Sequence, residues 1–85
     1  MPMPAVTFAQ AFRRHVDCPD EMIEATTVGE ALATYFDRHP RVRGYVVDDA
    51  GALRRHVTVF ADDRQLHHRE ALTTPVDATA TIYMF

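Results

Sequence analysis

Lysine is absent from this sequence, cysteine occurs once and glycine three times, and each scarcity excludes a class of structure or function. Cys18 has no second cysteine to pair with, so an internal disulfide is excluded and nothing indicates an oxidising compartment. Gly29, Gly44 and Gly51 are isolated from one another, which excludes a glycine-rich phosphate loop and a dinucleotide-binding fingerprint. A Ser-His-Asp order is also missing, so an autonomous enzyme is not expected.

Concentrated positive charge is scarce as well. The net charge is -3 at pH 7, and the adjacent pairs Arg13-Arg14 and Arg54-Arg55 are small. Binding of nucleic acid relies on the release of counterions from phosphates, which requires a concentrated basic surface. The sequence therefore argues against a general nucleic-acid-binding protein.

Long hydrophobic runs are also missing. No apolar stretch approaches the roughly 18 residues that are needed to cross a bilayer, and Met1-Pro2-Met3-Pro4 lacks the charged and apolar regions of a secretion signal. We therefore expect a cytoplasmic protein that does not bind membranes. With 85 residues, of which 47% are hydrophobic, the chain has room for one small domain, residues 1–85, around one core.

The first third of the sequence predicts a hairpin followed by a helix. Val6-Thr7-Phe8 alternates apolar and polar residues, as a half-buried strand does, and residues 10–20 predict a loop into a second strand near residues 22–25. Thr27-Val28-Gly29-Glu30 matches a capping box, in which the threonine and glutamate side chains satisfy free amides at a helix start. One apolar stripe at helical spacing follows, formed by Val28, Ala31, Leu32, Tyr35 and Phe36. Pro40 is expected to end this helix after about three turns.

The second half predicts mostly strands. Tyr45-Val46-Val47 is a candidate short strand, and Asp48-Asp49-Ala50-Gly51 indicates a turn. Residues 56–61 give the clearest strand, with Val57, Val59 and Ala61 expected beneath the helix. The remaining residues predict a turn at Asp62-Asp63, a short strand at residues 64–66, an irregular connection at residues 67–77 and a last strand at residues 80–85.

The order of these elements, a hairpin, a helix and then further strands, predicts an α+β fold. It is the order of a β-grasp, the ubiquitin fold. We expect a mixed sheet of four to five strands, covered by one main helix.

Four segments resemble the MoaD/ThiS family of ubiquitin-like sulfur carriers. Thr27-Val28-Gly29-Glu30-Ala31-Leu32 is similar to the TVGEAL helix start of that family, and His39-Pro40 is similar to the pair that follows its helix. The stretch DDAGALRRHV at residues 48–57 resembles the family's turn, Leu-Arg and strand, and LTTPVD at residues 72–77 resembles its LxTPLxD segment. Together the four segments cover most of residues 6–85, in the family's order.

The resemblance implies a carrier function. In the family, an ATP-dependent, ubiquitin-activating-type adenylyltransferase activates a terminal glycine carboxylate, and the resulting thiocarboxylate donates sulfur to an accepting enzyme in molybdopterin, thiamin or cysteine-type biosynthesis. Such a carrier is a protein cosubstrate and needs no cofactor of its own. Because this chain lacks lysine, it could not form ubiquitin-like chains through its own side chains.

One departure from the family concerns the tail. Family members continue for about half a dozen residues to a terminal Gly-Gly, which enters a narrow active site without side chains that clash, whereas this sequence stops at Phe85. Three interpretations remain open: the tail lies outside these residues, different processing creates it, or the protein is a β-grasp that carries no sulfur. The last interpretation predicts a non-catalytic ubiquitin-like binding module or protein modifier.

A partner-binding surface is predicted on the sheet face opposite the helix. Simple alternation places Phe60, Tyr83 and Phe85 on that face, and exposed aromatic side chains of this kind mark partner sites. Arg54 and Arg55 are candidates for a charged rim. The alternatives are that the aromatic residues only shield a small sheet and that the arginines are merely solvated.

Two further groups of residues are weak candidates for a metal site and for a catalytic nucleophile. His67-His68, near Glu70 and with His56, invites a metal hypothesis, but zinc requires three or four converging ligands, and adjacent residues rarely converge. Cys18 close to His15 lacks the orienting third group that a catalytic cysteine needs. We therefore predict neither a metal site nor catalytic residues.

Overall fold

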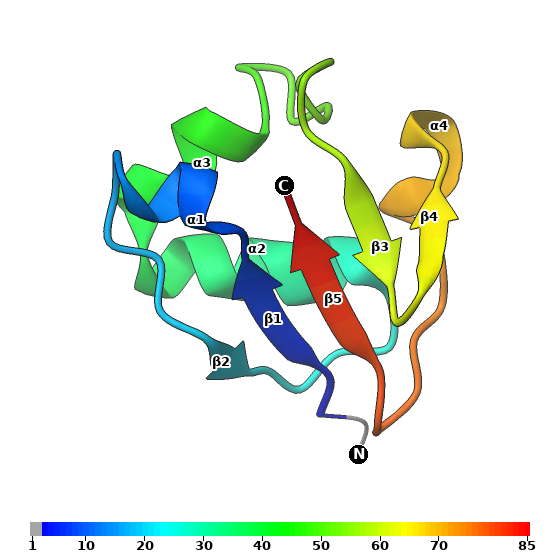
Figure 1. The fold of residues 1–85 in the computed structure, drawn as a ribbon. Helices are drawn as coiled ribbons and strands as arrows, with labels where there is room; N and C mark the ends of the chain where they lie inside the picture. The colour runs from blue at the N-terminus through cyan, green and yellow to red at the C-terminus, as the bar shows by residue number, and fades with distance from the viewer. Residues whose placement is uncertain (1–2) are drawn as a thin grey trace.

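A mixed five-stranded sheet forms the centre of the computed structural model, which describes residues 3–85 apart from the side chain of Arg69. The strands are β1 (Ala5–Phe8), β2 (Glu21–Met22), β3 (Val59–Ala61), β4 (Arg64–Leu66) and β5 (Thr81–Met84), in the order β2-β1-β5-β3-β4. The central strand β5 runs parallel to β1 and antiparallel to β3 (Figure 1). One long helix crosses a single face of this sheet. This is the β-grasp arrangement, so the predicted fold class is confirmed.

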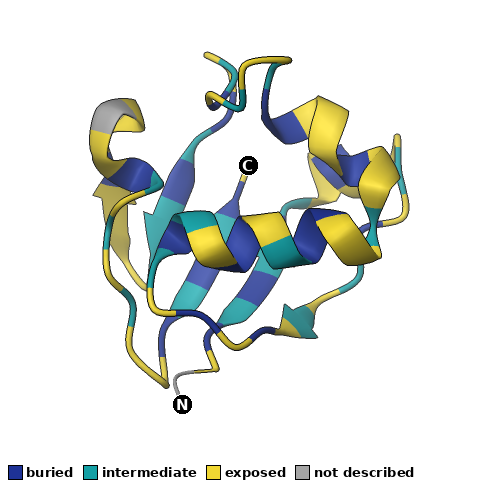
Figure 2. Ribbon diagram, turned by 180° about the vertical axis from the view of Figure 1, so that it is seen from behind, coloured by how far each residue is buried: buried dark blue, intermediate teal, exposed yellow. Residues whose placement is uncertain are grey.

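The long helix, α2 (Val28–Arg38), begins close to where the sequence predicts it. The Thr27 hydroxyl accepts a hydrogen bond from the Glu30 amide at 3.2 Å, which satisfies one free donor of the first turn. The Glu30 carboxylate accepts from the amide and hydroxyl of Thr26, one residue earlier than in a standard capping box. These bonds from Thr26 lower the pKa of the Glu30 carboxyl. The predicted apolar stripe is buried, as Figure 2 shows along the inner side of α2.

Pro40 ends α2 and also starts the next helix, α3 (Pro40–Val46). Proline is favoured at a first helical position, since its missing amide would have no partner there. The predicted strand at Tyr45-Val46-Val47 is therefore wrong: the first two residues finish α3, and Val47 forms a single bridge to Leu53. Val42 and Val46, four residues apart, are both fully buried, so helical spacing gives this segment its core contacts.

Other differences from the predictions are local. Residues 10–20, expected as a loop, contain the short helix α1 (Gln10–Arg13), which is anchored by buried Phe12. The predicted irregular connection contains α4 (His68–Ala71), anchored by buried Ala71. The strand predicted near residues 22–25 is the shorter β2, which ends at Met22, and the strand predicted at residues 56–61 is regular only over β3. A left-handed Asp62 makes the β3–β4 turn, as predicted for Asp62-Asp63.

The core lies between α2 and the inner face of the sheet. Leu32 on α2 and Ile82 and Met84 on β5 are almost completely inaccessible, and Tyr35 donates its hydroxyl hydrogen to the Pro19 carbonyl at 2.6 Å. Val57 and Val59 are buried, and Ala61 packs against the core, as the alternation predicts. Among the described residues, no helix covers the opposite face (Figures 1 and 2). Within residues 3–85, no helix has the length and apolar character that a membrane span requires.

Candidate docking surface

Three aromatic side chains meet on the open face of the sheet. Phe60 on β3 is directly opposite Tyr83 on β5, and Phe85 lies two residues further along the same face. The Phe60 and Phe85 rings are stacked, with centroids 5.3 Å apart and planes at 11°. The Tyr83 ring lies 5.5 Å from that of Phe85. The structure therefore brings together the three residues that alternation places on one face, which we call the aromatic cluster.

The aromatic cluster is accessible. Phe85 is 48% exposed, while Phe60 and Tyr83 are half-buried. Met22, at the other edge of the same face, is 57% exposed. Aromatic side chains dominate binding energy where proteins meet, because they bury a large area at low entropic cost. The cluster is thus suited to docking, and its role in binding remains a prediction.

The two predicted rim arginines lie in the loop before β3. Arg54 donates from Nε to the Gly44 carbonyl at 2.8 Å, which fixes its side chain against α3. Arg55 is exposed. Both therefore lie toward the end of the sheet where β5 finishes, rather than over its open face, and their role in binding is untested.

The end of β5 is held by main-chain hydrogen bonds. The Phe85 amide donates a hydrogen bond to the Thr58 carbonyl at 2.9 Å, and the Thr58 amide donates one to the Phe85 carbonyl at 2.6 Å. On the other side, the Ala9 amide donates to the Met84 carbonyl at 2.8 Å. Sheet pairing thus extends to Phe85, while the side chain of Phe85 stays half-exposed.

Members of the two weak candidate groups, His68 and Cys18, have structural contacts in the fold. His68 donates a ring N–H to the Val57 carbonyl at 2.6 Å, and the described residues contain no group of three or more side chains placed to hold a metal ion. Cys18 is 1% exposed, and burial raises the pKa of its thiol, which disfavours the nucleophilic thiolate.

The sequence analysis missed one polar network. Glu21 on β2 accepts a hydrogen bond from Arg38 at 3.0 Å and pairs with the His39 ring, so the edge strand is tied to the end of α2. The bond from His39, followed by that from Arg38, holds the pKa of the Glu21 carboxyl below its usual value. Glu21 lies 17 residues from Arg38 and 18 from His39 in the sequence, with no shared motif, so no sequence signal marks the network.

Comparison with solved structures places this architecture among known folds. The chain is similar to a crystal structure of small archaeal modifier protein 1 from H. volcanii, with a TM-score of 0.82, 18% identity, and coverage of 100% of this chain and 97% of that one. It is also similar to a crystal structure of SAMP1 from Haloferax volcanii, with a TM-score of 0.80, 19% identity and coverage of 95% and 90%. No protein-family model and no curated protein matches the chain. The fold is thus shared over nearly the whole of both chains.

Proposed function

We propose that this chain is a ubiquitin-like carrier or modifier protein that an ATP-dependent, ubiquitin-activating-type adenylyltransferase recognises. Its role is that of a protein cosubstrate rather than a catalyst. The proposal is supported by the fold, which it shares over nearly its whole length with a protein named as a small archaeal modifier. It is also supported by the four segments that resemble the MoaD/ThiS family.

The finer proposal is that the chain carries sulfur. A carboxylate is a poor electrophile, and conversion to an acyl adenylate supplies a good leaving group. Replacement of that group by sulfur gives a thiocarboxylate, which a biosynthetic enzyme of molybdopterin, thiamin or cysteine type accepts as a sulfur source.

The observation that carries this proposal is the position of β5. It is the central strand, and pairing with Thr58 holds the chain in the sheet as far as Phe85. Residues that follow Phe85 would leave the sheet at this point, beside the aromatic cluster. A partner docked on the cluster would therefore be close to the reacting carboxyl group.

Mass spectrometry of the protein isolated from its native cells tests the carrier proposal. The expected product ends in Gly-Gly and gains about 16 mass units when sulfur replaces oxygen. Incubation with the activating enzyme and ATP should yield the adenylate beforehand. A native terminus at Phe85 that ATP and the enzyme leave unmodified would overturn the proposal.

A second candidate is a ubiquitin-like binding module that docks a partner without acyl chemistry. The stacked pair Phe60 and Phe85 favours it, because an accessible aromatic surface can bind a partner by contact alone. Phe60→Asp should abolish partner binding and leave thermal stability nearly unchanged, since Phe60 lies outside the buried core. The matched control is Met22→Asp, which adds the same charge at the far edge of the face. Unaltered affinity in Phe60→Asp, measured by calorimetry with the activating enzyme, would reject docking through the cluster.

A further inference from the structure

Two hollows lie side by side at the end of the molecule where β1 and β5 finish. The first, of about 260 Å³, is lined mainly by apolar and aromatic groups: Ala11, Phe12, His15, Tyr45, His56 and Phe85. The second, of about 720 Å³, is more polar and shares His15 and Tyr45 with the first. We call the two together the end groove. Its walls come from α1, α3, the loop before β3 and the end of β5, so it exists only in the folded chain.

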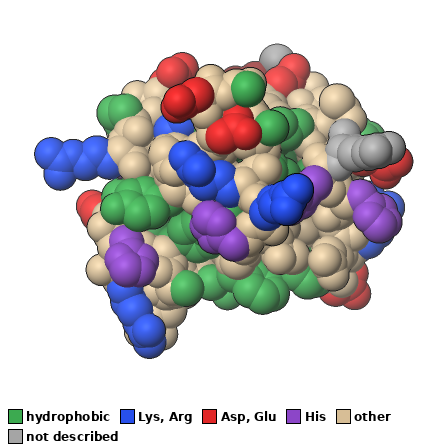
Figure 3. Space-filling view, turned by 90° about the horizontal axis from the view of Figure 1, so that it is seen from above, with side chains coloured by type: hydrophobic (Ala, Val, Ile, Leu, Met, Phe, Trp, Pro, Cys, Tyr) green, Lys and Arg blue, Asp and Glu red, His purple; other side chains and the backbone are tan. Residues whose placement is uncertain are grey.

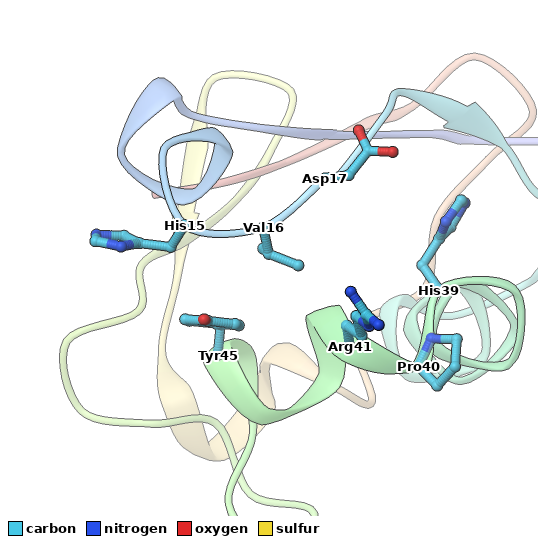
Figure 4. A pocket seen from close by; sticks show the side chains of 7 residues that line it. All are labelled: His15, Val16, Asp17, His39, Pro40, Arg41 and Tyr45. Atoms are coloured by element: carbon cyan, nitrogen blue, oxygen red, sulfur yellow. The ribbon is translucent and has the colours of Figure 1, made fainter.

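A stacked pair of rings separates the two hollows. The His15 and Tyr45 rings are 6.2 Å apart, with planes at 16°. Figure 4 shows this pair on one side of the second hollow, with Arg41 rising from α3 into the middle and His39 on the far side. Val16 points into the same space. A ligand that crosses the ring pair would therefore meet apolar groups on one side and a guanidinium on the other.

The position of Arg41 suits the end groove to an anionic group of a ligand. Arg41 is exposed, and Arg54 is held beside the groove by its bond to the Gly44 carbonyl. Among the described side chains that line the two hollows, Arg41 is the one guanidinium and Asp17 the one carboxylate. In Figure 4 the Arg41 side chain reaches into the hollow, whereas the Asp17 carboxylate points away from it. Figure 3, a view onto this end, shows arginine and histidine side chains across the middle of the face, between an acidic margin and a hydrophobic one. Neutral imidazoles also present an N–H donor each.

At the opposite end of the molecule, most of the charged side chains that line a hollow are acidic. There, Asp62, Asp63 and Asp77 line a hollow near the β3–β4 turn, with Arg64 as its basic member. Acidic side chains thus predominate in that hollow, whereas the guanidinium of Arg41 reaches into the middle of the end groove (Figure 4).

We propose that the end groove binds a short, extended, acidic segment of a partner protein. One large apolar side chain of that segment occupies the first hollow, and a neighbouring carboxylate pairs with Arg41 in the second. The first hollow is smaller than a usual small-molecule pocket of about 300–1,000 Å³, and the second lies within that range. Both hollows are open to solvent and adjoin one another, which suits an extended polypeptide that crosses from one to the other. The guanidinium fork of arginine matches the geometry of a carboxylate.

This surface is distinct from the docking face described above, although Phe85 belongs to both. It lies on the end of the sheet, whereas the aromatic cluster lies on the open face. The inference does not require acyl chemistry, so it holds or fails independently of the carrier proposal. Variants that test it therefore leave Phe85 unchanged.

A fluorescent peptide with one phenylalanine next to three aspartates is the probe, and its asparagine analogue is the control ligand. Fluorescence anisotropy should show binding of the acidic peptide and at least about tenfold weaker binding of the analogue. Arg41→Gln should weaken binding by roughly tenfold, because a charge-assisted hydrogen bond is lost. Ala11→Trp, at an exposed position of α1, should fill the first hollow and weaken binding similarly.

Arg43→Gln is the matched control variant, because Arg43 is exposed on the same helix but lines a different hollow. It should leave the affinity within about twofold of wild type. Equal binding of the two peptides, equal weakening by Arg43→Gln and Arg41→Gln, or no binding at the highest soluble concentration would each overturn the proposal. Concentration-dependent self-association that Arg41→Gln abolishes would assign the groove to a second copy and also overturn it. Since Arg41 is exposed, that variant remains a valid test even if Ala11→Trp fails to fold.

Discussion

A methyl group added at Gly29 should destabilise the protein, although alanine normally favours a helix. The Gly29 amide donates to the Leu72 carbonyl at 2.8 Å, and a Cβ at Gly29 would lie only 2.6 Å from that same oxygen. The oxygen belongs to the main chain and cannot turn aside as a flexible side chain would. Neighbouring bonds from Val28 to Thr74 and from Val76 to Thr26 hold the same segment in place. The segment must therefore shift as a unit.

The expected change in the free energy of unfolding follows from one gain and two costs. Replacement of a helical glycine by alanine contributes about 0.5–1 kcal/mol of stability where space allows. Overpacking against fixed atoms costs about 1–3 kcal/mol, and weakening the Gly29–Leu72 hydrogen bond costs about 1 kcal/mol more. We expect Gly29→Ala to lose about 1–3 kcal/mol net. For a domain of this size, each 1 kcal/mol corresponds to a change in Tm of about 4–8 °C.

Gly44→Ala provides the matched control. Gly44 is also helical, but a Cβ there would meet nothing within 4 Å, so this variant should gain about 0.5–1 kcal/mol. Urea and thermal denaturation followed by circular dichroism measure both changes. A Gly29→Ala protein as stable as wild type, or a Gly44→Ala protein that is destabilised as much, would refute the reasoning.

Two more predictions concern the core and the edge strand. Leu32 is 1% exposed between α2 and the sheet, so Leu32→Ala should cost about 2–5 kcal/mol in urea denaturation; a change within error would remove Leu32 from the core. Folding lowers the pKa of the Glu21 carboxyl. The ionised carboxylate therefore stabilises the folded state at pH values above the ordinary carboxyl pKa, about 4.3, and this stabilisation is lost as the pH falls through the lowered pKa. Glu21→Gln should therefore be less stable than wild type at neutral pH and approach it in acid. A stability difference that does not vary with pH would contradict this linkage.

The sequence predicted the elements whose signals are strong and local. The α2 stripe was predictable because the five apolar residues recur at helical spacing behind a cap at Thr27, and this spacing leaves one way to bury them. The shared face of Phe60 and Tyr83 followed from alternation along two strands, whereas their direct pairing is seen only in the structure. Pro40 was predicted as a stop, but proline also starts helices, and the valines of α3 suit a strand or a helix when taken alone.

The end groove could not be predicted from the sequence. His15, Tyr45 and His56 lie on three separate segments, and neither spacing nor residue type links them before the chain folds. The same holds for Glu21 and His39. Local periodicity predicts which face of an element is buried, whereas such sites depend on how loops pack around the end of the sheet.

The central position of β5 has a consequence for the order of folding. β5 lies between β1 and β3, and these two strands do not pair with each other. β1 and β5 pair although they lie far apart in the sequence. Pairings between residues so far apart in sequence carry a large loop-closure cost and slow the folding rate. During synthesis, the sheet cannot close until β5 has left the ribosome, so we expect this small protein to acquire its structure in one late, cooperative step.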